Sequence, residues 1–310
     1  RTESIFGKGW TPEIDTMDTF VCSSWYYLRY PNANYNKAAF DKEKLNWLPV
    51  DVYVGGAEHA TMHLLYARFV TKALRDFGYL NFNEPFIKLF HQGTITKDGV
   101  KMSKSKGNAV DPNELIKQYG ADTVRLFVMF AAPPDQSFEW SDQGVQGASR
   151  YLNRLWNLVQ DHIQSGVINN KDFNNSSDEV SELRNKTHQT LRKLKDDFVR
   201  RHAFNSAIAS IMELTNAIPK KFLSSQASDI EKSAVNEAIN IVLIALSPIA
   251  PHITHSLWNQ LGNKQAIIDV TWPEADEDLL EKQKIVIVIE VNGKRRATIN
   301  INPHLTQEEI

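Results

Sequence analysis

The chain has 310 residues, of which 42% are hydrophobic and 23% charged, and its formal net charge is −2. These proportions exclude a disordered chain, and no apolar run reaches the roughly 18 residues that span a bilayer, so we expect no membrane partner. The single cysteine, Cys22, excludes an intramolecular disulfide and any zinc site built on two cysteines, and it favours a reducing, cytoplasmic location. Both chain ends suggest a piece of a longer protein.

Residues 1–140 alternate strand-like and helix-like segments. The β-prone run Asp51-Val52-Tyr53-Val54 precedes Gly55-Gly56 and a helical pattern from about Glu58 to Phe77, which Gly78 would end. This alternation predicts an α/β domain with a parallel sheet.

A second strand-like stretch in this region runs from Lys88 to Ile95 and turns at Asp98-Gly99. Beyond it, Asp111, Pro112 and Glu114 have the pattern of a helix start with a capping box.

Residues 141–265 are almost purely helical in pattern and predict a helix bundle. One helix is expected from about Asp142 to Ser165, ended by Gly166, and two more are expected later, broken near Pro219 and Pro248. Between them lies an apolar stripe at helical spacing, formed by Leu183, Thr187, Leu191, Leu194 and Phe198.

Residues 266–310 begin a further small α+β domain. An acidic connector over 274–281 leads to two strand-like runs, 285–291 and 295–301, which flank the hairpin signal Asn292-Gly293. The expected organisation is therefore three domains, with boundaries near 140 and 265.

The sharpest motif is Lys101-Met102-Ser103-Lys104-Ser105, followed by Lys106-Gly107-Asn108. A chance match to these five letters in a chain of this length is on the order of one in ten thousand. Flexible lysines suit phosphate oxygens, and serines with exposed backbone N–H groups add donors. The alternative is a solvated basic surface loop.

A second motif runs from Gly55-Gly56 to His63, where a strand leads through glycines into a helix start. Such a junction lets a ligand approach the backbone and meet the positive end of the helix dipole. His59 and His63 are four residues apart and would share a helix face. They could instead be buried core histidines, and a metal site would need a third ligand that the sequence does not supply.

A third segment, residues 18–27, combines small hydroxyls with aromatic side chains. It includes Ser23 and Tyr26, which could line a pocket for an apolar side chain with a polar head group. A core segment is the alternative.

A basic cluster lies between residues 184 and 201, where two carboxylates, Asp196 and Asp197, are outnumbered. Its members are Arg184, Lys186, Arg192, Lys193, Lys195, Arg200 and Arg201. They flank the apolar stripe and form either a solvated helix face or a set of contacts to an RNA backbone.

Together these motifs resemble the class I aminoacyl-tRNA synthetases, and the long match is to the bacterial-type leucyl-tRNA synthetase family. The lysine motif is similar to the family's second ATP-binding signature. The other matching segments are Asp15-Thr16-Met17-Asp18-Thr19-Phe20, Ser23-Ser24-Trp25-Tyr26, Leu48-Pro49-Val50-Asp51, Gly55-Gly56-x-Glu58-His59-Ala60-x-x-His63-Leu64-Leu65-Tyr66, Tyr119-Gly120-Ala121-Asp122-Thr123-x-Arg125-Leu126, Glu139-Trp140-Ser141-Asp142-x-Gly144-Val145 and Val291-Asn292-Gly293-Lys294.

The resemblance implies the second half of a Rossmann-like catalytic domain, a tRNA-binding bundle and a truncated C-terminal domain. The sequence of this chain does not contain the family's first ATP signature, His-x-Gly-His, or the family's editing domain. The implied activity is ligation of leucine to tRNA(Leu) through leucyl-adenylate, with a separate N-terminal half as partner. The alternative is an inert tRNA-binding fragment or subunit that needs that half.

The family roles carry over to matching positions as expectations. Lys101 and Lys104 would be catalytic, and magnesium would come with ATP and need no structural metal site in the protein. ATP would contact Gly55, Gly56, Glu58, His59, Gln92, Gly93, Lys101, Met102, Ser103, Lys104 and Ser105. Leucine would contact Ser23, Tyr26, His59 and His63. The tRNA would contact Arg192, Lys193, Arg200 and Arg201.

Overall fold

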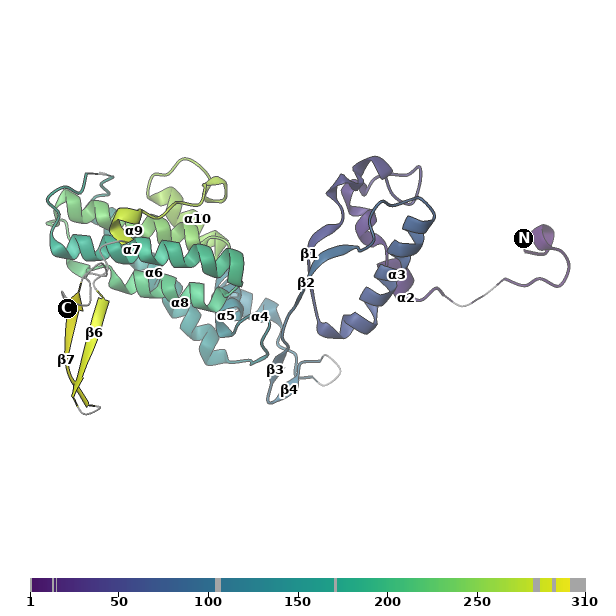
Figure 1. The fold of residues 1–310 in the computed structure, drawn as a ribbon, viewed down its shortest axis with the longest axis horizontal. Coiled ribbons are helices and arrows are strands. Elements are labelled where there is room, and N and C mark those ends of the chain that lie inside the picture. Colours follow the sequence, from purple (N-terminus) through teal and green to yellow (C-terminus); the bar gives the residue numbers. More distant parts are fainter. Residues whose placement is uncertain are drawn as a thin grey trace. The chain divides into compact units, whose positions relative to one another are not determined.

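The computed structural model describes residues 2–12, 14, 16–103, 107–169, 172–280, 285–291 and 294–301. The chain forms two compact units, Arg1–Thr94 with Asp135–Ser137, and Ile95–Pro134 with Phe138–Ile310 (Figure 1). In the described part of the chain, no helix combines the length and the apolar character needed to cross a membrane.

The first unit is built on a β-α-β arrangement. Strands β1 (Val50–Gly55) and β2 (Phe86–His91) pair in parallel, and helix α3 (His63–Asp76) connects them in sequence. The pairing confirms the predicted parallel sheet. The small core of this unit consists of Tyr27, Leu28, Phe40, Leu64, Ala67, Leu80 and Phe86. The helical elements that precede β1 are α1 (Thr2–Phe6), α2 (Thr19–Ser23), η1 (Tyr26–Leu28), η2 (Tyr30–Asn32) and η3 (Lys42–Trp47).

Helix α3 begins later than the sequence predicted. Residues Ala57–Thr61 form a 3₁₀ turn, η4, and Met62 leaves the helical region with φ −118° and ψ −106°. The chain therefore changes direction at Met62, so a single helix from Glu58 is wrong. The C-terminus is as expected, because Gly78 takes φ +74°, a backbone conformation that favours glycine.

The second unit opens with a three-stranded sheet. Strand β3 (Ile95–Lys97) pairs antiparallel with β4 (Val100–Lys101) and parallel with β5 (Phe138–Glu139). The predicted turn is confirmed, since Asp98 and Gly99 both have positive φ, as a tight β-hairpin requires.

Helix α4 (Pro112–Tyr119) begins at the predicted residue. The Asp111 carboxylate accepts the N–H of Asn113 at 2.9 Å. The cap is confirmed, but the bond goes to the second helical residue, whereas the predicted capping box requires the third, Glu114.

The bundle confirms the predicted helical region. Helix α6 has the expected bounds, Ser141 caps it by accepting the Gly144 N–H, and the stripe residues Leu183, Leu191 and Leu194 are buried on α7. One more helix forms than was predicted, because Pro251 starts α10 as its first residue. The helices are α5 (Ala121–Ala131), α6 (Asp142–Ser165), α7 (Asp178–Asp196), α8 (Phe204–Ala217), α9 (Asp229–Leu246) and α10 (Pro251–Gln260).

Two charged side chains of α5 attach it to the ends of α9 and α10. The buried Asp122 carboxylate accepts the backbone N–H of Ile253 and the Nδ1–H of His252, each at 2.7 Å, at the N-terminus of α10. Arg125 donates to the carbonyls of Pro248 and Ile249, at 2.9 and 2.8 Å, just after α9 ends. Each charge lies at the helix end whose dipole it complements.

The last elements follow the predicted connector. Shorter turns of this unit are the π-helical η6 (Asp197–Arg201), η7 (Lys220–Leu223), η8 (Ile267–Asp269) and α11 (Glu277–Leu280). Strands β6 (Ile285–Val291) and β7 (Lys294–Ile301) pair antiparallel, which confirms the hairpin. Its turn residues, Asn292 and Gly293, lie outside the described residues.

Candidate functional site

A cavity of about 430 Å³ lies in the first unit, at the carboxyl end of the parallel strand pair. This edge of an α/β sheet is where such folds bind ligands. Seven residues predicted as ligand contacts line it: Ser23, Tyr26, Gly55, Gly56, His59, His63 and Gln92. Three separate segments of sequence therefore converge on one cavity. Two predicted contacts, Glu58 and Gly93, are not among its lining residues.

A chain of hydrogen bonds crosses the cavity wall. The Tyr53 hydroxyl lies 2.8 Å from the Tyr26 hydroxyl and 2.8 Å from Nε2 of His63. Tyr53 in turn stacks on Phe86, with ring centroids 3.8 Å apart. The wall is therefore fixed in position before any ligand enters.

The same burial tunes the ionisation of these groups. Burial raises the pKa of the Tyr26 hydroxyl, and the hydrogen bond to Tyr53 raises it further. Burial also lowers the pKa of His63, with a smaller contribution from neighbouring His59. Both groups are thus neutral near pH 7, and the cavity wall offers hydrogen bonds rather than charge.

The two histidines keep an unused ring atom each. Nδ1 of His59 and Nδ1 of His63 are buried and have no hydrogen-bond partner in the described structure. Their rings meet edge to face at 6.1 Å, although His59 lies in η4 and His63 starts α3. Unsatisfied buried nitrogens beside a cavity indicate a place for a polar ligand.

The three predicted glycines differ in why they are glycine. A Cβ on Gly93 would lie 2.1 Å from the backbone oxygen of Gln136, so this position needs glycine for packing. A Cβ on Gly56 would meet the Glu58 carboxylate at 2.3 Å. A Cβ on Gly55 would have no neighbour within 4 Å among the described residues. Gly55 therefore leaves its backbone open to the cavity without any packing reason.

Sequence analysis missed several residues of the cavity. They are Phe20, Tyr53, Val54, Leu64, Leu89 and His91. His91 stands opposite Gly55 in the strand pair, and its Nδ1 lies 3.4 Å from the Gly55 carbonyl oxygen. The sequence places both residues at the ends of strands, but it does not give the register in which β1 pairs with β2. That register was needed to predict that His91 lies in the cavity.

The loop that begins with the lysine motif at Lys101, here named the lysine loop, belongs to the second unit. Lys101 is exposed at the end of β4, and Met102 and Ser103 follow it, partly buried. The Asn108 side chain joins the two sides of the loop, since it accepts the Ser103 N–H at 2.8 Å and donates to the Lys101 carbonyl at 3.3 Å. The predicted residues Lys104 and Ser105 lie outside the described residues.

A carboxylate fixes the hairpin that precedes this loop. Glu139 on β5 accepts the Thr96 hydroxyl at 2.5 Å and the Gly99 N–H at 3.2 Å. These hydrogen bonds hold the pKa of Glu139 below its usual value, the Thr96 bond contributing most. The loop therefore extends from an anchored base.

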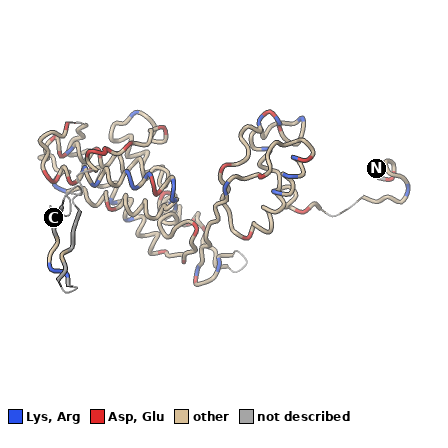
Figure 2. The backbone as a smooth tube through the Cα atoms, viewed as in Figure 1, with Lys and Arg blue, Asp and Glu red and all other residues tan. Residues whose placement is uncertain are grey.

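All seven basic residues of the 184–201 cluster lie within 4 Å of a carboxylate. Figure 2 shows both acidic and basic positions on the bundle helices. The pairs are Arg184 with Glu237, Lys186 with Glu213, Arg192 with Glu277, Lys193 and Arg201 with Asp197, Lys195 with Glu274, and Arg200 with Asp196. The longest is Arg192–Glu277, at 3.9 Å, and Asp197 is fully buried between its two partners. Much of this charge therefore serves the bundle itself.

Within the described ranges, no group of three or more His, Cys, Asp or Glu side chains is placed to hold a metal ion.

Comparison with known proteins gives consistent matches along the chain. Residues 9–141 match the family model of class I tRNA synthetases (I, L, M and V), and residues 181–310 match that of the anticodon-binding domain of tRNA ligases. Leucine–tRNA ligase of Alcanivorax borkumensis is 51% identical over 93% of this chain and 35% of its own length. That of Nitrosococcus oceani is 51% identical over 96% of this chain and 36% of its own. The chain thus spans about a third of the length of the curated relatives it matches.

Solved structures agree with these matches. The agnB2 LeuRS of Agrobacterium radiobacter K84, in a ternary complex with tRNA and LeuAMS, matches 99% of this chain and 40% of its own, with a TM-score of 0.84 and 35% identity. Methionyl-tRNA synthetase of Mycobacterium tuberculosis, in complex with methionyl-adenylate, matches 79% of this chain and 50% of its own, with a TM-score of 0.59. At 19% identity, the second likeness speaks for the fold alone.

Proposed function

The chain belongs to the leucine–tRNA ligase family of class I tRNA synthetases, and from this we propose that it forms the second half of a leucine-activating site together with a tRNA-binding bundle. The single observation that carries the proposal is the 430 Å³ cavity, where residues from three distant segments meet.

The cavity suits an amino acid and an adenosine side by side. Tyr26, His63 and Ser23 would surround the leucine, whose amino and carboxylate groups can hydrogen-bond to the buried ring nitrogens and hydroxyls. Gly55 would let the nucleotide approach the backbone, since nothing in the packing there requires glycine. Gln92, at the end of β2, would contact the adenine.

The reaction needs positioning and charge stabilisation more than a protein nucleophile. The leucine carboxylate oxygen forms a bond to the α-phosphorus of ATP as the bond to pyrophosphate breaks. Lys101 and Lys104 would neutralise the leaving pyrophosphate, and Ser103 would add a donor. Magnesium would enter with ATP, bound to its phosphates. The adenylate would then pass its leucyl group to a terminal ribose hydroxyl of tRNA(Leu), with release of AMP.

Exposed apolar side chains on the sheet support a partner for the first unit. Val52 and Val54 on β1 are 48% and 58% exposed, and Ile87 and Leu89 on β2 are 68% and 42% exposed. Strands of a parallel α/β sheet are ordinarily covered on both faces. We therefore propose that an N-terminal half of the catalytic domain packs against this sheet.

For tRNA, the proposed contacts on α7 and η6 are Arg192, Lys193, Arg200 and Arg201. Arg192 and Arg200 have side chains 58% and 74% exposed, so either can exchange its carboxylate for a phosphate. A cytoplasmic location follows from a tRNA substrate and forms part of the proposal.

The test is leucine-dependent exchange of labelled pyrophosphate into ATP. It is measured with the 310-residue chain alone and with the N-terminal half of a related leucine–tRNA ligase added in trans. Exchange only in the mixture is the expected result. No exchange in either case, with retained tRNA binding, would contradict the catalytic proposal and favour a tRNA-binding subunit.

A further inference from the structure

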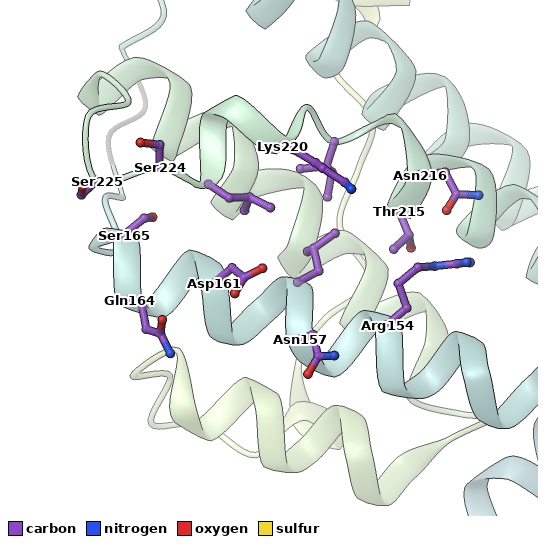
Figure 3. A pocket seen from close by; sticks show the side chains of 13 residues that line it. Arg154, Asn157, Asp161, Gln164, Ser165, Thr215, Asn216, Lys220, Ser224 and Ser225 are labelled. Carbon is purple, nitrogen blue, oxygen red and sulfur yellow. The ribbon is translucent and has the colours of Figure 1, made fainter.

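The bundle contains a second cavity, of about 670 Å³, which the leucine-activation proposal does not use. Its walls come from the C-terminal half of α6, the end of α8 and the turn η7 (Figure 3). It is therefore a surface of the helical bundle, and all its lining residues belong to the second unit.

Four polar side chains of this cavity have no side-chain partner among the described residues, whereas Ser165, Thr215 and Ser224 are hydrogen-bonded within the bundle. Asn157, Asp161, Asn216 and Lys220 are exposed, and none of them has a hydrogen bond or ion pair with a described residue. The Arg154 guanidinium group lies 5.7 Å from the centre of the Tyr151 ring and forms no hydrogen bond or ion pair with a described residue. The basic residues of α7 are ion-paired, whereas Arg154 and Lys220 form no ion pair with a described carboxylate. The cavity thus holds donors that are free to bind an external ligand.

The polar groups are segregated by chemistry. Figure 3 places Arg154, Asn216 and Thr215 at one end of the cavity, and the Lys220 side chain extends from its middle toward that end. Ser165, Ser224, Ser225 and Gln164 gather at the other end.

Between the two ends lie Asp161 and an apolar floor. Leu158, Ile218 and Leu223 line that floor. A cationic end, a central carboxylate and apolar side chains beside hydroxyls correspond to the parts of one ribonucleotide.

We propose that this cavity binds one nucleotide of an RNA strand, and the proposal deepens the tRNA-binding function on which it rests. Arg154 and Lys220 would hold the phosphate, as cations do at nucleic-acid backbones. The base would lie on the apolar floor with its edge toward the serine hydroxyls and amides.

The central carboxylate argues for RNA over other anions. Asp161 can accept a hydrogen bond from a ribose 2′-hydroxyl, the group that distinguishes RNA from DNA. The same carboxylate would repel an acidic peptide lying along the cavity. A free phosphate would use only the cationic end and would leave the floor and the serines unoccupied.

The experiment measures binding of a tRNA(Leu) transcript to the full chain by fluorescence anisotropy at several salt concentrations. The double variant Arg154→Ala/Lys220→Ala should bind at least tenfold more weakly, because two charge-assisted hydrogen bonds are lost. The slope of log affinity against log salt should fall by about 1, as expected for one phosphate contact. The control Lys264→Ala removes an exposed lysine elsewhere in the same unit and should change neither value appreciably.

A second variant tests the ribose contact. Asp161→Asn should reduce the preference for a single-stranded RNA over the DNA of the same sequence by about threefold or more, with circular dichroism unchanged. All the substituted side chains are exposed, so the helices should fold normally.

The outcomes separate the two proposals. Unchanged affinity and salt slope in the double variant, with a parent chain that binds tRNA, would overturn this inference and leave the proposed function standing. A parent that binds no RNA but binds inorganic phosphate, with that binding lost in the double variant, would overturn both the RNA assignment and the tRNA-binding part of the proposed function. Pyrophosphate exchange would still report on leucine activation independently.

Discussion

The two units of the molecule differ in how completely they bury their apolar side chains. The first unit has a core of seven buried residues, and it carries most of the large apolar side chains that are exposed in the described structure, such as Phe69 at 71% and Ile87 at 68%. The second unit buries more than thirty, several of them, such as Leu194 and Ile211, completely. The unit with the ligand cavity is thus the less self-sufficient of the two.

The difference teaches which unit can be expected to act alone. Apolar burial provides about 25 cal/mol for each Å² removed from water, so a small, half-covered core gives little stability. The bundle buries its apolar side chains among its own helices, so its stability does not depend on a partner. The first unit, which is proposed to bind leucine and ATP, leaves apolar side chains of its sheet exposed.

The largest effect is expected for Lys104→Ala, which should change the adenylation rate and leave leucine binding in the cavity nearly unchanged. Lys104→Ala should lower the rate of leucine adenylation by about a hundredfold or more, because the cation proposed to neutralise the leaving pyrophosphate is lost. Leucine affinity, which depends on the first unit, should change little. Equal losses in the two measurements would contradict this division of roles. Pyrophosphate exchange and equilibrium dialysis, each on the complemented protein, give the two numbers.

Gly93→Ala should destabilise the first unit alone, by about 3 kcal/mol or more. The new methyl group would meet the Gln136 backbone at 2.1 Å, and the backbone cannot rotate away as a side chain would. Hydrogen exchange followed by mass spectrometry reports the two units separately. The control Gly55→Ala, where a Cβ has no described neighbour within 4 Å, should leave exchange unchanged while weakening ATP binding. Faster exchange in the bundle helices of Gly93→Ala would show that the units do not fold independently.

Asp122→Ala tests the second unit in the same way, with an expected loss of about 2 kcal/mol. The substitution leaves the Ile253 N–H and the His252 ring without their acceptor at the start of α10. Asp229→Ala, at an exposed position in the first turn of α9, is the matched control and should cost well under 1 kcal/mol. Urea denaturation monitored by far-UV circular dichroism measures both, and similar losses in the two variants would argue against the role of Asp122.

Tyr53→Phe should cost about 1 kcal/mol in the first unit, since one hydroxyl bonds both Tyr26 and His63. Leucine affinity should fall as the wall loses its fixed geometry. Tyr79→Phe removes a hydroxyl from an exposed ring and serves as control. A Tyr53→Phe chain with unaltered leucine affinity would show that the hydrogen-bond chain is not part of the site.

The smallest expected effect is a loss of stability at low pH, which should occur in both units. Burial lowers the pKa of His63 in the first unit and of His162 in the second, so the unfolded chain binds a proton before the folded chain does. Stability is full above pH 6.5, the ordinary histidine value, and declines as the pH falls below it toward the lower folded pKa. His63→Gln should flatten that decline in the first unit only, and His162→Gln in the second only. Hydrogen exchange at pH 7.5 and 5.5 makes the comparison, and a decline that neither variant alters would exclude both histidines as its cause.

Local sequence signals predicted local structure well. The bounds of α6 follow from Ser141 and Gly166 at its ends and an apolar period between them, all readable within one segment. The Asp98-Gly99 turn and the stripe of α7 are of the same kind. The break at Met62 was not predictable, because no proline or glycine marks it.

What the sequence could not supply is long-range pairing. Tyr53 and His91 enter the cavity only because β1 and β2 align, 36 residues apart at Gly55 and His91. The basic residues of α7 looked available for RNA in the sequence, but several pair with carboxylates far along the chain. Glu274, for example, is 79 residues from its partner Lys195. The boundaries near 140 and 265 and the assigned roles of the site residues stay predictions.

The α5 clamp has a mechanical consequence. Strands β3 and β4 carry the lysine loop, β5 anchors their hairpin, and α5 is tied to α9 and α10 by Asp122 and Arg125. All of these elements belong to one unit, the unit of the bundle. The lysine loop is therefore part of the same compact unit as the bundle that is proposed to bind RNA. If the bundle moves when RNA binds, the lysines that are proposed to contact phosphate would move with it, because they belong to the same unit.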